Sequence, residues 1–203
     1  IEAYCDEEYG GGNGALAAGL KHSCDAIINT DGGNFEVWSC SMGGGVFEIG
    51  VEIVLPQDSS VLAVDALLTV REELLPFIER RHAELRDDRY FKGTDMERSA
   101  FRFYEFLAGD GGLGCNLGRG KLSFVFYTNK PEEAIGRELA DTETRISERL
   151  EKIGVKTTGF KPRSRFFHCL CLPDEDETLR TVLSSAQDAC GKPVKISGAC
   201  LSD

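Results

Sequence analysis

The chain has 203 residues, 41% of them apolar, and its 23 basic and 34 acidic side chains give a net charge of −11. This length suits one or two domains, and the apolar content supports a packed core, which excludes disorder and collagen-like order. The acidic balance argues against nucleic acid or an anionic membrane surface as a partner. No apolar run reaches the roughly 18–20 residues that span a bilayer. The chain starts without Met and without a signal-like segment, and we expect it to be a piece of a longer protein.

The cysteines match neither a disulfide framework nor zinc-finger spacing. Most of them lie within apolar runs, so we expect reduced, buried thiols in a cytoplasmic protein. Cys169 and Cys171 would face the same way on a strand, and a redox or metal role for this pair is the alternative. The eight cysteines are Cys5, Cys24, Cys40, Cys115, Cys169, Cys171, Cys190 and Cys200.

The first thirty residues predict a strand–helix–strand unit. Residues 1–5 and 25–30 are typical of short buried strands, and residues 15–22 are rich in helix formers. A unit of this length favours two parallel strands joined by a right-handed crossover. Acidic residues follow both strands, so we expect them at the carboxyl edge of the sheet, where open α/β sheets bind ligands.

The middle of the chain predicts a strand and helix order of its own. Two strands, at 35–40 and 46–54, flank Met42-Gly43-Gly44-Gly45, whose glycines permit a tight turn or a hinge. The pattern then predicts a long helix that Pro76 can kink, two strands, an amphipathic helix and a last strand. These elements span 60–87, 100–107, 121–128, 131–153 and 165–172. The β-α-β-β-α-β order is ferredoxin-like.

A final helix at 175–190 and a strand at 193–197 return to the style of the first residues. We therefore predict an α/β domain, residues 1–44 and 173–203, interrupted by an inserted ferredoxin-like (βαββαβ) domain at 45–172. A ferredoxin-like sheet leaves an edge strand and a helix free to pair across a two-fold axis. We expect a homodimer through residues 45–172.

Three acidic side chains carry the strongest chemical signal. The carboxylates of Glu7 and Glu8 repel each other, so a site that holds them close has a cation nearby or raises a pKa. One can bind a metal ion while the other takes a proton from metal-bound water, and Asp31 can supply a third oxygen ligand. A Glu-Glu pair alone is usually a solvated loop. The combination of strand, acidic pair, glycine turn, helix, strand and acid favours a site.

Two segments, DEEYGGGNGALAAG ending at Gly19 and CDAIINTD ending at Asp31, resemble the zinc aminoacylase, acetylornithine deacetylase, succinyl-diaminopimelate desuccinylase and carboxypeptidase family of co-catalytic metallohydrolases. GKPVKISGACLSD at the end of the chain resembles the strand by which that family re-enters its catalytic domain. The resemblance implies a zinc-binding α/β domain interrupted by a ferredoxin-like lid. It implies Glu7 as the general base, Glu8 and Asp31 as ligands of two zinc ions, and Asn116 as a substrate contact.

The resemblance also implies parts that residues 1–203 lack. A His-x-Asp ligand segment, a bridging Asp and a final His ligand are missing, as are a lid histidine and a substrate-gripping arginine, at whose position Phe126 stands. The three histidines, His22, His82 and His168, are better explained as solvated or strand residues than as ligands. We therefore expect the 203-residue chain to be inactive, and the longer protein to hydrolyse a small-molecule amide or a peptide, with no nucleic acid or membrane partner.

Two alternatives stay open. The protein can be a non-catalytic homologue that uses its lid for dimerisation or protein association, which the missing lid residues favour. An acidic adaptor for basic partners rests on net charge alone, and net charge reports on solubility more than on a partner. The metal is also open, because zinc, cobalt and manganese accept the same ligand types.

Overall fold

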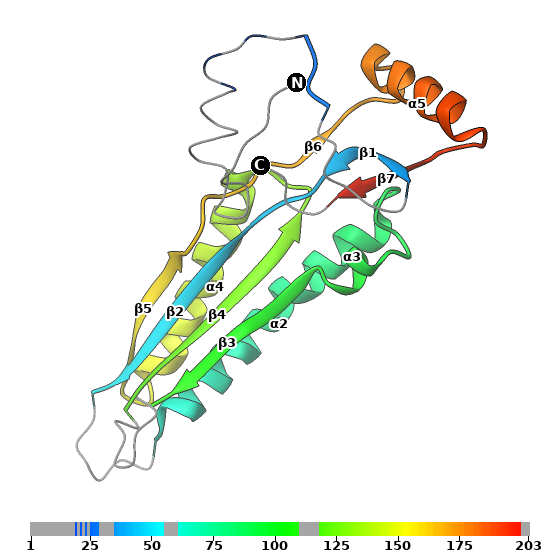
Figure 1. Ribbon diagram of the computed structural model, residues 1–203. Helices are drawn as coiled ribbons and strands as arrows, with labels where there is room; N and C mark the ends of the chain where they lie inside the picture. The colour runs from blue at the N-terminus through cyan, green and yellow to red at the C-terminus, as the bar shows by residue number, and fades with distance from the viewer. Residues whose placement is uncertain are drawn as a thin grey trace. The chain divides into compact units, whose positions relative to one another are not determined.

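The computed structural model describes residues 19, 21, 23, 25–28, 35–54, 61–109 and 118–199. The chain divides into two compact units (Figure 1). Unit 1 comprises Ile1–Ser41 and Leu170–Asp203, and unit 2 comprises Met42–Cys169. Unit 2 and the predicted lid at 45–172 cover nearly the same residues, and we call unit 2 the lid unit.

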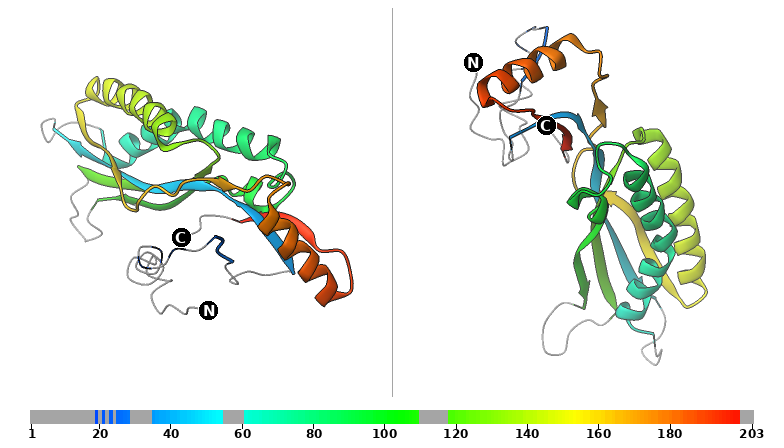
Figure 2. Two further views of the ribbon diagram at one scale, coloured as in Figure 1. Left: turned by 90° about the horizontal axis from the view of Figure 1, so that it is seen from above. Right: turned by 90° about the vertical axis from the view of Figure 1, so that its right-hand side faces the viewer.

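The lid unit is a four-stranded antiparallel sheet with two long helices on one face (Figures 1 and 2). The strand order is β3-β4-β2-β5, so β3 and β5 are the edge strands. The order along the chain, strand, helix, two strands, helix, strand, confirms the predicted ferredoxin-like fold. The elements are β2 (Gly43–Ile53), α2 (Ala63–Asp87), the short α3 (Asp95–Arg98), β3 (Phe101–Ala108), β4 (Arg119–Thr128), α4 (Glu132–Glu151) and β5 (Val155–Pro162).

The core of the lid unit is formed by apolar side chains that alternate along the strands and recur at helical spacing along α2 and α4. In β4, Leu122, Phe124 and Phe126 point to the helices and are fully buried. Phe77 of α2 meets the Phe126 ring edge-on, with ring centroids 5.1 Å apart. Full burial of each large apolar side chain contributes about 1.5–3 kcal/mol, so this layer dominates the stability of the unit. Pro76 lies inside α2, which continues as one helix from Ala63 to Asp87.

The last strand of the lid unit differs from its prediction. The sequence pattern favoured 165–172, but β5 is Val155–Pro162 and pairs with β2 directly after α4. Gly159 has a positive φ of 70°, and the register shifts between Ile49 and Val51 of β2. This bulge interrupts the two-residue alternation of β5, which is why the pattern did not reveal a strand there.

The glycine run is part of a strand rather than a turn. β2 begins at Gly43, and Gly44 pairs with Phe167 through two backbone hydrogen bonds of 2.9 and 2.8 Å. A Cβ on Gly43 would lie 2.5 Å from the carbonyl oxygen of Phe167, and one on Gly44 would collide with that of Phe126. Gly44 also has φ of 143°. Close approach of neighbouring backbones therefore requires these glycines.

The named elements in the described part of unit 1 are a three-stranded sheet of order β6-β1-β7 and the helix α5. β1 and β7 run parallel, while β1 and the two-residue β6 run antiparallel. The Lys195 ammonium lies 3.0 Å from the Glu36 carboxylate, and this hydrogen bond lowers the pKa of Glu36. Asp176 caps the helix by accepting a bond from the Leu179 N–H. The elements are β1 (Glu36–Ser41), β6 (Leu170–Cys171), α5 (Glu177–Cys190) and β7 (Lys195–Ala199).

Two expectations for unit 1 are wrong. Residues 25–28 are exposed and form no strand, with Ile27 79% exposed, because nothing in the described part of the chain covers them. Cys40 and Cys171 are joined in a disulfide, although reduced thiols were expected. They stand opposite each other in the β1–β6 pair, a proximity that linear spacing does not reveal. Among the described cysteines, Cys169 and Cys190 are free.

Candidate functional site

The four residues predicted to form the active site, Glu7, Glu8, Asp31 and Asn116, all lie outside the described residues. The Nδ1 of His82 lies 3.1 Å from the carbonyl oxygen of Glu97. His168 is largely exposed, 3.8 Å from Glu132. The polar clusters and surfaces described next belong to the lid unit.

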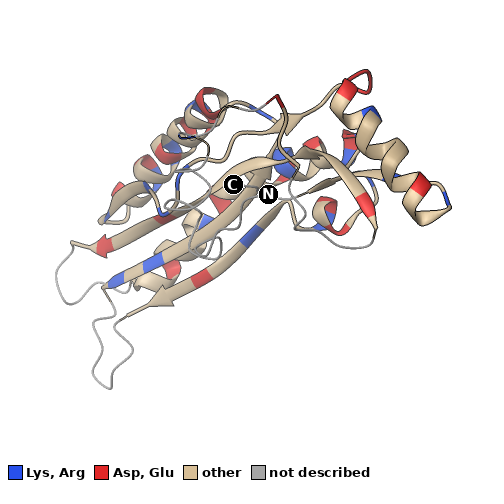
Figure 3. Ribbon diagram, turned by 45° about the horizontal axis from the view of Figure 1, so that its top comes forward, with Lys and Arg blue, Asp and Glu red and all other residues tan. Residues whose placement is uncertain are grey.

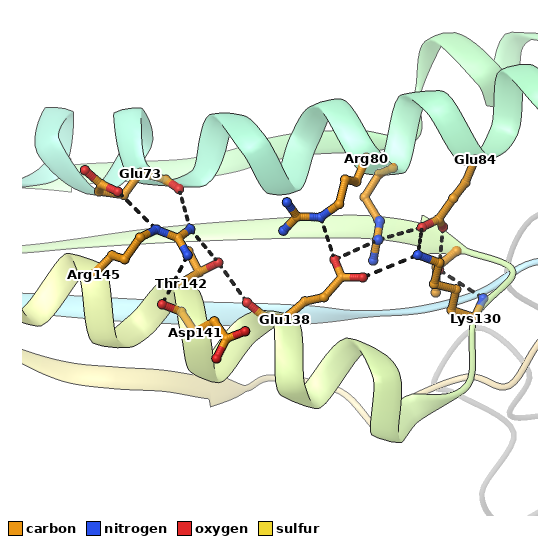
Figure 4. Close-up of polar contacts among 10 residues, drawn as sticks. Glu73, Arg80, Glu84, Lys130, Glu138, Asp141, Thr142 and Arg145 are labelled. Atoms are coloured by element: carbon orange, nitrogen blue, oxygen red, sulfur yellow. Dashed lines mark hydrogen bonds and ion pairs between the residues drawn. The ribbon is translucent and has the colours of Figure 1, made fainter.

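A buried ion network joins the two lid helices (Figure 4). The Arg81 guanidinium is fully buried and donates to the carboxylates of Glu84 and Glu138, at 2.6 and 2.9 Å. Arg80 donates to the same oxygen of Glu138, at 2.9 Å, and Lys130 lies 3.2 Å from Glu84. Burial alone would raise the pKa of Glu138, but the hydrogen bond from Arg80 and the charges of Arg81 and Lys130 outweigh burial and lower it.

A second group of ion pairs between the same two helices is exposed to solvent. Arg149 of α4 reaches Glu72 and Glu73 of α2 at 2.6 and 2.9 Å, and Arg145 lies 3.4 Å from Glu73. Exposed pairs contribute little individually, whereas the buried group around Arg81 is costly to disrupt. These charged side chains contact one another, so they stabilise the packing of α2 against α4.

The open face of the lid sheet carries charges of both signs (Figure 3). Lys121 of β4 lies 2.9 Å from Glu105 and 3.5 Å from Glu48, and Arg163 lies 3.4 Å from Glu48. The hydrogen bond from Lys121, joined by one from Ser123, lowers the pKa of Glu105. These four charges pair with one another across the strands, so together they do not form a patch of one sign.

A groove of about 460 Å³ runs between α4 and the segment from Phe160 to Phe166. Its apolar lining includes Phe47, Leu139 and Phe166. The carboxylate of Glu143, which also lines it, accepts a 2.7 Å hydrogen bond from the backbone N–H of Phe160. Glu143 therefore holds α4 against the bulged strand β5. This contact depends on the bulge, so no local pattern in the sequence predicts it.

Apolar side chains are exposed on α2 and on the edge strand β3, and we call them together the association face: Val64, Leu68 and Leu75 of α2 with Tyr104, Phe106 and Leu107 of β3. The three α2 residues recur at spacings of four and seven, so they share one side of the helix. Glu73 and Arg80, which bond to α4, lie on a different side. The adjoining strand, β3, is an edge of the sheet. An apolar helix flank beside an edge strand is typical of a protein-association surface.

The fold, an α/β unit interrupted by a ferredoxin-like unit, is the fold that the resemblance implies. No protein-family model and no curated protein matches the sequence. Among solved structures, human carnosine dipeptidase 1 aligns at a TM-score of 0.59 and 11% identity, over 88% of this chain and 48% of its own. Aminopeptidase PepT from Bacillus cereus aligns at 0.58 and 10%, over 87% and 43%. A hydantoinase/carbamoylase-family amidase from Burkholderia vietnamiensis aligns at 0.53 and 14%, over 81% and 37%.

These structures are similar to the chain in fold, and the chain spans less than half the length of each. All three are named as enzymes that act on amide or peptide bonds, an amidase, an aminopeptidase and a dipeptidase. No helix in the described part of the chain is long and apolar enough to cross a membrane.

Proposed function

We propose that the chain belongs to a metal-dependent hydrolase of amide bonds, either an N-acyl amino acid deacylase or a peptidase. The observation that carries the proposal is topological. A split βαββαβ unit is inserted between β1 and the β6–β7 segment of a second α/β unit, and an amidase, an aminopeptidase and a dipeptidase align over more than four-fifths of this arrangement.

The proposed chemistry uses the acids of the sequence motif. Glu7 would be the general base, and Glu8 and Asp31 would be carboxylate ligands of two zinc ions, with Asn116 as a substrate contact. Zinc would supply a Lewis acid and lower the pKa of bound water. Because these residues lie outside the described part of the chain, the assignment rests on the motif, and no catalytic step is derived from it.

The test is the activity of the longer protein against N-acyl amino acids and dipeptides, with and without a chelator. Glu7→Gln should abolish turnover, because a general base contributes about 10²–10⁴-fold. Glu36→Gln is the matched control. Glu36 forms an ion pair with Lys195 in unit 1, so this variant should have the same activity as the wild type. Full activity of Glu7→Gln, or activity unaffected by the chelator, would disprove the assignment.

We also propose that the 203-residue chain alone is inactive, because the motif supplies only part of a two-metal ligand set. Zinc should bind no tighter than tens of micromolar, since tight binding needs a complete ligand set. Isothermal titration calorimetry measures this directly, and nanomolar binding would show that the chain contains a full site.

A non-catalytic homologue that uses the lid for association is the second candidate. Phe126 stands where the family resemblance places a substrate-gripping arginine, and it is fully buried against Phe77. This strand therefore cannot bind a substrate carboxylate through that position. Absence of turnover in the longer protein, together with stable dimers, would favour this candidate.

We propose a homodimer formed through the association face. Two copies related by a two-fold axis would bury the apolar flank of α2 and could extend the sheet through β3.

We also propose that the protein is cytoplasmic. Disulfides in that compartment are usually transient or redox-sensing, so Cys40–Cys171 fits it only if cellular thiols reduce the bond.

A further inference from the structure

We propose that Cys40–Cys171 is a thiol-responsive modification site in which Cys171 is the residue that accepts a small thiol such as glutathione. The inference is independent of the proposed hydrolase function. It rests on the pairing of β1 with β6 and on the unequal exposure of the two cysteine residues.

The two cysteines occupy directly opposed positions of an antiparallel pair. The Leu172 N–H donates to the Ser39 carbonyl oxygen at 2.8 Å, so Ser39 and Leu172 form the hydrogen-bonded pair next along the ladder. Cys40 and Cys171 therefore form a non-hydrogen-bonded pair, the type in which opposed residues approach more closely. Their Cα atoms are 4.0 Å apart. The backbone register thus brings together two residues that are 131 positions apart in sequence.

The partners differ in access to solvent. Cys40 is 3% exposed, whereas Cys171 belongs to a strand whose two residues are both exposed. Thiol–disulfide exchange requires a thiolate to reach one sulfur atom of the bond, and access decides which. An external thiolate should therefore attack the Cys171 sulfur.

The exchange balances with glutathione as the reductant. A glutathione thiolate bonds to the Cys171 sulfur, the Cys40–Cys171 bond breaks, and the Cys40 sulfur leaves with the electron pair and takes a proton from water. A second glutathione then attacks the glutathione sulfur of the mixed disulfide. This step releases Cys171 as a thiol and forms oxidised glutathione, so one protein disulfide and two glutathione molecules give two protein thiols and one glutathione disulfide.

Reduction should also loosen β6. This strand has two residues, and the disulfide is its covalent link to β1. Amide hydrogen exchange at Leu170–Leu172 should accelerate on reduction, while amides of β4 in the lid core should exchange as before. Reduction of this one bond would then change hydrogen exchange only nearby, in the segment that links the lid unit to α5.

The test treats the full chain with limiting glutathione, quenches it with acid and maps adducts by mass spectrometry. A background of Cys24→Ser with Cys169→Ser makes the assignment unique, because Cys24 shares one tryptic peptide with Cys40 and Cys169 shares one with Cys171. Cys190→Ser is the exposed-thiol control. We expect peptides of Cys40 and Cys171 to be linked before treatment and the adduct to appear on Cys171. Alkylation of both cysteines in the unreduced, unfolded chain, or an adduct on Cys40, would overturn the proposal.

A second measurement compares the alkylation rates of two variants, each of which lacks one of the two cysteines. In the folded Cys40→Ser variant, Cys171 should react with iodoacetamide roughly tenfold or more faster than Cys40 reacts in the folded Cys171→Ser variant. The reason is that access to the sulfur atom controls thiol reactivity. Circular dichroism establishes that each variant retains its fold. Equal rates in two folded variants would refute the assigned asymmetry.

Discussion

Glu138 is the centre of the buried network, and its replacement by leucine should destabilise the lid unit strongly. The change removes one carboxylate from the fully buried Arg81 guanidinium, and it also removes the partner of Arg80. Breaking a buried pair by deleting one partner costs about 3–5 kcal/mol. Because Arg81 keeps Glu84 at 2.6 Å, we expect the lower end of this range, about 3 kcal/mol. That is a large part of a typical total of about 5–15 kcal/mol.

The assay is urea unfolding followed by far-ultraviolet circular dichroism, which reports mainly on the long helices α2 and α4. Glu133→Leu is the matched control, since Glu133 is an exposed glutamate of the same helix and its replacement should change stability by less than about 0.5 kcal/mol. The double variant Arg81→Met with Glu138→Leu should recover at least half of the loss, because both buried charges are then gone. A single variant as stable as the wild type, or a double variant less stable than both singles combined, would refute the reasoning.

Three further predictions concern the same unit. The folded pKa of Glu138 lies below its ordinary value of 4.5, so its ionised form stabilises the fold above that pH. The stability difference between wild type and Glu138→Leu should therefore narrow as the pH falls below 4.5, and a stability difference that stays constant from pH 7 to 3 would contradict this. Gly44→Ala should lower the free energy of unfolding by about 1–3 kcal/mol from the positive φ alone, and the clash with Phe126 adds to this loss. Gly136→Ala, at an exposed position of α4, should raise the free energy of unfolding by about 0.5–1 kcal/mol. Thermal unfolding measures both variants, and equal effects would disprove the steric argument. Sedimentation should show a dimer that Leu68→Glu with Leu75→Glu converts to a monomer, and a wild-type monomer at high concentration would contradict the association face.

The sequence predicted those elements whose pattern is uninterrupted. The alternating Leu122, Phe124 and Phe126 revealed β4, and the spacing of apolar residues revealed α2 and α4. The strand β5 was missed because the bulge at Gly159 breaks its alternation. The glycine run was expected to turn because the sequence does not show how closely Phe126 and Phe167 approach it.

The candidate site was predictable only as a motif. Glu7, Glu8 and Asp31 form a recognisable pattern in the sequence, but it does not define the distances among them. The contacts that sequence reasoning missed join residues far apart along the chain. Arg81 with Glu138 and Cys40 with Cys171 meet only because helices pack and strands align, and neither partner carries a local signal for the other.

The backbone pair between Gly44 and Phe167 has a practical consequence for protein engineering. It brings the beginning and the end of the lid unit together, at positions 42 and 169, within one antiparallel ladder. A short linker could therefore join these ends, and new termini could be opened in the turn after α4, giving a circular permutant with the same sheet order. Such a permutant would allow the lid unit to be produced and studied as a molecule in its own right.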